Sequence, residues 1–171
     1  MNDPVPATEG PDAGVPWHWG DPLREQRALD STGLVDLSHR GVVSVSGPDR
    51  LSWLHSLTSQ HLSELAPGVG TTGYVLSANG HLEHAFHGVD DGETFWAHTE
   101  PGAAPALAAW LDSMRFMLRV EVADRTDLLS VVWQSGAEPR PGSGNGHRIT
   151  RSGADSLGGH ESFIPRDHLA D

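Results

Sequence analysis

The central part of the chain alternates β-branched stretches with segments of helical periodicity. Residues 42–45 carry three valines and end at Gly47-Pro48, which predicts a strand followed by a turn. From Pro48-Asp49 onward, leucines recur at helical spacing through residue 57, which predicts a helix with one apolar face and Trp53 beside it. Further on, residues 71–77, 81–89 and 94–99 predict three strands. Asn79-Gly80, between the first two, is a strong hairpin signal.

Residues 103–117 are rich in alanine and leucine and predict a second long helix, after which 118–123 and 128–133 predict two more strands. The order strand, helix, strands, helix, strand predicts an α+β fold with a ferredoxin-like antiparallel sheet in a slightly expanded form. We expect one continuous core from the apolar positions of these elements, namely Val43, Val45, Leu51, Leu54, Leu57, Leu107, Leu111 and Val120. We also expect Trp96, Trp110 and Trp133 to pack in the core between helix and sheet.

The chain divides by composition into four segments. Residues 1–20 are Pro-rich and predict a disordered leader, although Trp17 and Trp19 within it favour docking on the domain surface. Residues 21–134 form the first subdomain, which begins with a helix over 23–29 capped by Asp21 and an extended stretch over 34–38. Residues 135–146 are a Gly/Pro/Ser-rich loop. Residues 147–171 predict two short strands and a helix start, which we interpret as the incomplete beginning of a second subdomain.

Composition excludes several classes of function. The chain has no cysteine, which excludes disulfides, thiolate nucleophiles and cysteine-ligated metals. Its formal net charge of −12 argues against nucleic-acid binding. No apolar run is long enough for a membrane helix and the amino terminus lacks the features of a secretory signal, so we expect a cytoplasmic location. All 11 basic residues are arginine and there is no lysine, which is typical of a high-GC genome.

The histidines do not predict a metal site. On a strand, His81 and Glu83 share one face while His84 points to the other, so three ligands do not converge. Adjacent residues of an extended segment also point apart, which argues against Ser38-His39 as a nucleophile and its base. The glycine-rich residues 68–73 lack the lysine of a phosphate-binding loop and precede a strand.

A collinear series of segments resembles the glycine-cleavage T-protein (aminomethyltransferase) superfamily, most closely its YgfZ branch as found in actinobacteria. The series covers about residues 17–125, and its main segments are Gly33-Leu34-Val35-Asp36-Leu37-Ser38-His39, Val43-Ser44-Val45-Ser46-Gly47-Pro48-Asp49, Leu76-Ser77-Ala78-Asn79-Gly80-His81-Leu82 and Met114-Arg115-Phe116-Met117-Leu118-Arg119-Val120. The resemblance implies the T-protein/YgfZ fold, with tetrahydrofolate in a central cleft between subdomains.

The chain departs from the superfamily at two motifs. The transferases carry a pair of aspartates on the strand after the hairpin, and that pair falls on His84-Ala85 here. The cysteine motif of the YgfZ branch, in the carboxy-terminal half of the family's chain, is absent. We therefore expect no catalytic residues. For folate, the resemblance implies Glu100 at or next to a pterin-binding asparagine, with His84 and His98 as candidates for the cleft wall.

The resemblance implies a tetrahydrofolate-binding accessory protein that supports iron–sulfur cluster assembly or repair, with iron–sulfur proteins as partners and a weak or incomplete folate site in this chain. Two alternatives stay open. One is a true aminomethyltransferase, which the missing aspartates disfavour. The other is a truncated remnant or interaction module without a ligand.

Overall fold

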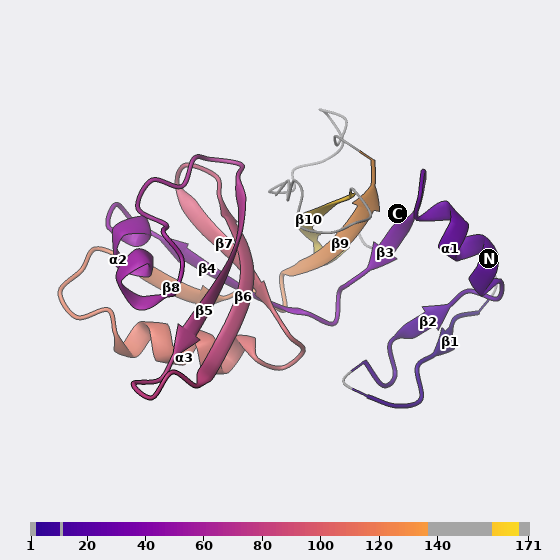
Figure 1. Ribbon diagram of the computed structural model, residues 1–171, viewed down its shortest axis with the longest axis horizontal. Helices are drawn as coiled ribbons and strands as arrows, with labels where there is room; N and C mark the ends of the chain where they lie inside the picture. Colours follow the sequence, from indigo (N-terminus) through magenta and orange to yellow (C-terminus); the bar gives the residue numbers. More distant parts are fainter. Residues whose placement is uncertain (1–2, 11, 137–158, 168–171) are drawn as a thin grey trace.

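The computed structural model describes residues 3–10, 12–136 and 159–167 (Figure 1). Two β-sheets and two helices make up most of this part of the chain, and a small hairpin and a short helix precede them (Figure 1). The elements in order are β1 (Val5–Pro6), β2 (Pro16–His18), α1 (Pro22–Ala28), β3 (Leu34–Asp36), β4 (Gly41–Ser46), α2 (Arg50–Leu57), β5 (Gly70–Leu76), β6 (Leu82–Asp90), β7 (Thr94–Thr99), α3 (Ala104–Ser113), β8 (Glu121–Asp124), β9 (Leu129–Ser135) and β10 (Gly159–Pro165).

The larger sheet has five strands in the order β5-β6-β7-β4-β8, with all neighbours antiparallel. The strands β4, β6, β7 and β8, with α2 after β4 and α3 after β7, have the ferredoxin-like order, and β5 adds one edge strand. The predicted fold class is therefore confirmed, including its expansion by a strand.

Both helices cover one face of this sheet, because residues of α2 and α3 share a single buried cluster with residues of the strands. All eight residues of the predicted core belong to it: six are buried, and Leu51 and Leu57 are partly buried against them. Trp53 is also buried in this cluster, and its indole nitrogen donates a hydrogen bond to the carbonyl of Met114 at 3.3 Å. Trp96 and Trp133 are buried, but Trp96 belongs to a second cluster on the face away from the helices and not to the core between helix and sheet, and Trp110 is partly buried.

Local signals in the sequence set most of the element ends. The Asp21 carboxylate accepts a hydrogen bond from the backbone N–H of Arg24 and caps α1. Gly80 has φ +78° in the predicted hairpin turn, a conformation that glycine adopts without strain. The helix expected over residues 103–117 ends at Ser113, and Phe116, three residues further on, has φ +49°, which an α-helix does not accommodate.

The smaller sheet has the order β10-β9-β3 and lies against the other face of the five-stranded sheet, where Val42, Trp96, Val131 and Phe163 form a second buried cluster. It joins β3 and β9, from the segment that we assigned to the first subdomain, with β10 from the segment 147–171. The sheet therefore includes strands from both sides of the predicted boundary. The sequence did not indicate this, because β9 pairs with strands that are far from it in the chain.

The strands β1 and β2 pair antiparallel within the segment that we expected to be a disordered leader. Backbone hydrogen bonds hold the hairpin, including Ala7 N–H to the Val15 carbonyl at 2.8 Å. We expected Trp17 and Trp19 to dock on the domain surface, but both are exposed. Residues 137–146 of the loop expected over 135–146 and the strand expected over 147–150 lie outside the described residues, as does most of the helix expected after residue 165. No helix in the described ranges has the length and apolar character to cross a membrane.

Candidate functional site

Glu100 follows β7 directly and is the most accessible of the three candidate folate residues. Its side chain is 60% exposed, and its Oε1 accepts a hydrogen bond from Arg40 Nη1 at 3.0 Å. Since Gly41 pairs with Thr99 across β4 and β7, the residues flanking this pair are neighbours in space. The carboxylate is therefore held in place by a guanidinium that the sequence did not single out.

His98, in β7, lies between the two sheets and is only 2% exposed. Its Nε2 is 2.9 Å from Oε2 of Glu161 in β10, and its ring is 6.1 Å from the ring of Phe163. Its Nδ1 is buried without a hydrogen-bond partner in the described part of the chain. A ligand reaches His98 only if the second sheet moves away.

His84 lies on the opposite face of the five-stranded sheet. Successive residues of β6 alternate between the faces, and His84 is on the side of Phe86, which belongs to the helix-covered core. The His84 ring is 6.0 Å from the Trp110 ring of α3. His84 and His98 therefore do not line one cleft.

His87 is the residue of β6 that shares a face with His98, and the sequence analysis did not single it out. Its ring is 5.1 Å from that of His98, and its Nδ1 is 2.9 Å from the Thr72 hydroxyl. Ala85, the second position of the substituted acidic pair, lies on this same face by strand alternation. Strand parity was the available signal, since residues 85, 87 and 98 all point away from the helix-covered core.

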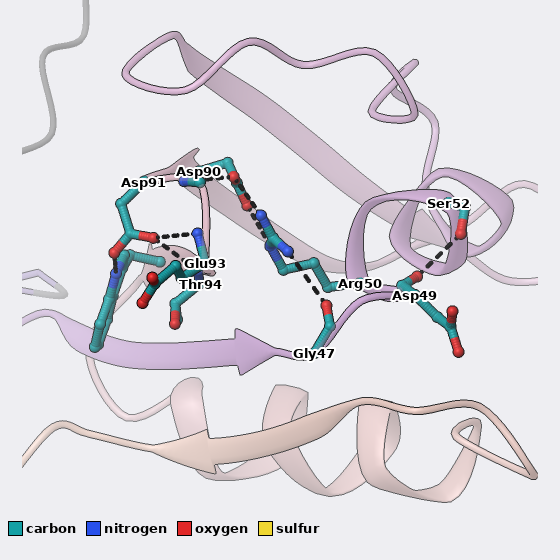
Figure 2. A network of polar contacts seen from close by, with 10 residues as sticks. Gly47, Asp49, Arg50, Ser52, Asp90, Asp91, Glu93 and Thr94 are labelled. Atoms are coloured by element: carbon teal, nitrogen blue, oxygen red, sulfur yellow. Dashed lines mark hydrogen bonds and ion pairs between the residues drawn. The ribbon is translucent and has the colours of Figure 1, made fainter.

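Two aspartates, Asp90 and Asp91, occur at the end of β6, but the side chains of both accept hydrogen bonds from other residues of the protein (Figure 2). Asp90 is buried and pairs with the Arg50 guanidinium through contacts of 2.6 and 2.7 Å. The hydrogen bonds that Arg50 donates to the Asp90 carboxylate raise the pKa of Arg50 above its ordinary value. Asp91 accepts hydrogen bonds from the backbone N–H of Thr94 and the indole N–H of Trp96. This network fixes the turn between β6 and β7.

A cavity of about 490 Å³ lies between the amino-terminal hairpin and residues 35–40. Arg40 lines it, so the cavity adjoins the Arg40–Glu100 pair. On its hairpin side, Asp12 Oδ1 is 3.3 Å from Nε2 of His39. The structure thus adds a second candidate ligand site that depends on the hairpin.

The described residues contain no group of three or more histidine, aspartate or glutamate side chains arranged to hold a metal ion. His81, which precedes β6, and Glu83, within β6, are both exposed. That the protein binds no metal stays a prediction, which elemental analysis can test.

The fold is that of the glycine-cleavage T-protein. The structure of the glycine cleavage system aminomethyltransferase T from Bartonella henselae superposes with a TM-score of 0.72 at 18% sequence identity, covering 95% of this chain and 50% of that chain. This likeness defines the architecture.

Similarity in sequence points to the same proteins. The chain is 28% identical over 129 residues to an aminomethyltransferase of Methylococcus capsulatus, which covers 74% of this chain and 36% of that protein. It is 25% identical over 135 residues to an aminomethyltransferase of Nitrosococcus oceani, a match that covers 74% of this chain and 34% of that protein. The chain thus spans about a third of the length of these curated relatives. No protein-family model matches it.

Proposed function

We propose that this chain belongs to a tetrahydrofolate-binding accessory protein of the YgfZ type, which supports iron–sulfur cluster assembly or repair and transfers no aminomethyl group. The observation that supports the proposal is the T-protein fold, and the family resemblance implies that His84-Ala85 stands where the transferases carry their acidic pair. His84 packs beside Trp110 and Ala85 has no ionisable group, so neither supplies a carboxylate to folate.

Glu100 is the residue that we propose contacts the pterin. A carboxylate accepts hydrogen bonds from two N–H groups of a heterocycle, and Glu100 is exposed while Arg40 holds one of its oxygens. His98 is buried in this arrangement and is a poorer candidate for direct contact.

We propose that folate affinity is weak in this chain. The chain matches half of the T-protein structure, and the cleft of that superfamily takes its walls from more than one subdomain. Each missing hydrogen bond to a charged group removes about 1.5–3 kcal/mol, or roughly ten- to hundredfold in affinity.

Calorimetry with tetrahydrofolate tests the binding, using wild type, Glu100→Gln and the matched control Glu93→Gln, which changes an exposed turn residue. We expect weak binding that Glu100→Gln lowers about tenfold and Glu93→Gln leaves unchanged. Equal affinities in all three chains would remove Glu100 from the site. Tight binding by wild type would contradict the proposed weak site.

A true aminomethyltransferase is the second candidate, favoured by the names of the curated relatives. A transfer assay separates the two, since product formation would overturn the accessory assignment. In cells, the accessory role predicts that deletion of the gene lowers the activity of iron–sulfur enzymes and spares glycine cleavage. The reverse pattern would support the transferase.

A further inference from the structure

The cavity beneath the amino-terminal hairpin has no part in the proposed folate contacts apart from Arg40. The hairpin forms one wall, and residues 35–40 form the other. Its volume of about 490 Å³ is within the range of about 300–1,000 Å³ that is usual for small-molecule sites. The contact between Asp12 and His39 joins the two walls.

Negative charge predominates in the lining of this cavity. Glu9, Asp12 and Asp36 contribute carboxylates, of which Asp12 contacts His39 and Asp36 accepts the backbone N–H of Ser38, whereas Arg40 is the single guanidinium among the lining residues. The charge of Arg40 is already offset by Glu100, which is not among the lining residues. The lining therefore disfavours an anion and favours a cation.

The hairpin wall of the cavity includes one large aromatic side chain, that of Trp17. Trp17 contributes to the lining although its side chain is 74% exposed, an unfavourable state for so large an apolar group. The face of an indole attracts cations, and the attraction strengthens as water is excluded. Val15, Val35 and Leu37 add apolar surface suited to alkyl groups.

We propose that this cavity binds a small organic cation, either a quaternary ammonium or a protonated amine with alkyl substituents. The cationic nitrogen lies against the Trp17 ring, the carboxylates compensate its charge, and the aliphatic residues contact its alkyl groups. This site shares only Arg40 with the proposed folate site, and neither proposal depends on the other.

The test uses choline chloride as the probe and 3,3-dimethylbutan-1-ol, which has nearly the same shape without the charge, as its neutral control. Sodium chloride holds the ionic strength constant, and binding to ¹⁵N-labelled chain is followed at the amide signals of Val35 and Leu37. We expect saturable shifts with choline and at least about tenfold weaker binding of the neutral analogue.

Two variants test the roles of the walls. Trp17→Ala is expected to weaken choline binding about tenfold, whereas Trp19→Ala, which changes an exposed tryptophan outside the lining, leaves it within about twofold. Glu9→Gln keeps the indole and is expected to weaken binding about twofold to fivefold.

Equal binding of choline and its neutral analogue would overturn the proposal, as would saturation that Trp17→Ala leaves unchanged. Absence of saturable shifts in wild type would overturn it as well. Unchanged amide signals in the five-stranded sheet show that each variant keeps its fold, so a loss of binding is attributable to the cavity.

Discussion

Replacing Asp90 by alanine removes the carboxylate at the centre of the network in Figure 2. Asp90 is 1% exposed and Arg50 12% exposed, so the pair is largely excluded from water. The substitution removes both contacts to the guanidinium and the acceptor of the Gly92 N–H at 2.8 Å. Arg50 then loses its carboxylate partner Asp90 and keeps its hydrogen bond to the Gly47 carbonyl at 3.2 Å.

An uncompensated buried charge costs about 3–5 kcal/mol of folding stability. Because the Arg50 side chain is partly exposed, we expect the free energy of unfolding to fall by about 3 kcal/mol. With a urea dependence of about 2 kcal/mol per molar, the denaturation midpoint should fall by about 1.5 M. The measurement is urea unfolding followed by tryptophan fluorescence and circular dichroism.

Asp112→Ala is the matched control, because Asp112 and Arg115 form an exposed pair at 3.4 Å. Its free energy of unfolding should change by no more than about 0.5 kcal/mol. The double variant Arg50→Ala/Asp90→Ala should lose less than the sum of the two single losses, since each single variant leaves a partner unpaired. If Asp90→Ala costs no more than Asp112→Ala, the interpretation of the pair as a buried structural contact is wrong.

Three further predictions concern the core, charge and metal content. Leu54→Ala should lower the free energy of unfolding by about 2–5 kcal/mol, since Leu54 is buried in the main core; an unchanged urea midpoint would contradict its placement there. Hydrogen bonds from Arg119 hold the pKa of Asp49 below its ordinary value of 3.8, so the stability from this pair is present above about pH 3.8 and is lost as the pH falls through the lowered pKa. An NMR titration should show the Asp49 midpoint rising in Arg119→Ala, and a midpoint that does not move would exclude the contact in solution. Elemental analysis of protein purified without chelator should find no stoichiometric zinc or iron, and a ratio near one metal per chain would overturn that expectation.

Strand parity also governs the candidate folate residues. Sequence predicted His84 and His98 correctly as strand residues, and alternation along β6 and β7 assigns each side chain to one of two faces. Which face meets the helices and which meets the second sheet depends on packing. For that reason the opposite placement of His84 and His98, and the position of His87 beside His98, emerged only from the structure.

The sequence by itself determined the elements of the five-stranded sheet and its helices, because hydrophobic periodicity and the Asn79-Gly80 turn are local signals. It also determined the main core, since residues with matching periods have one common face to bury. The tertiary structure decided the contacts between residues far apart in the chain. Glu161 reaches His98 across 63 positions, Arg50 reaches Asp90 across 40, and β3 pairs with β9 across about a hundred. Pairings over such separations depend on how the sheets pack, and no short window of sequence contains both partners.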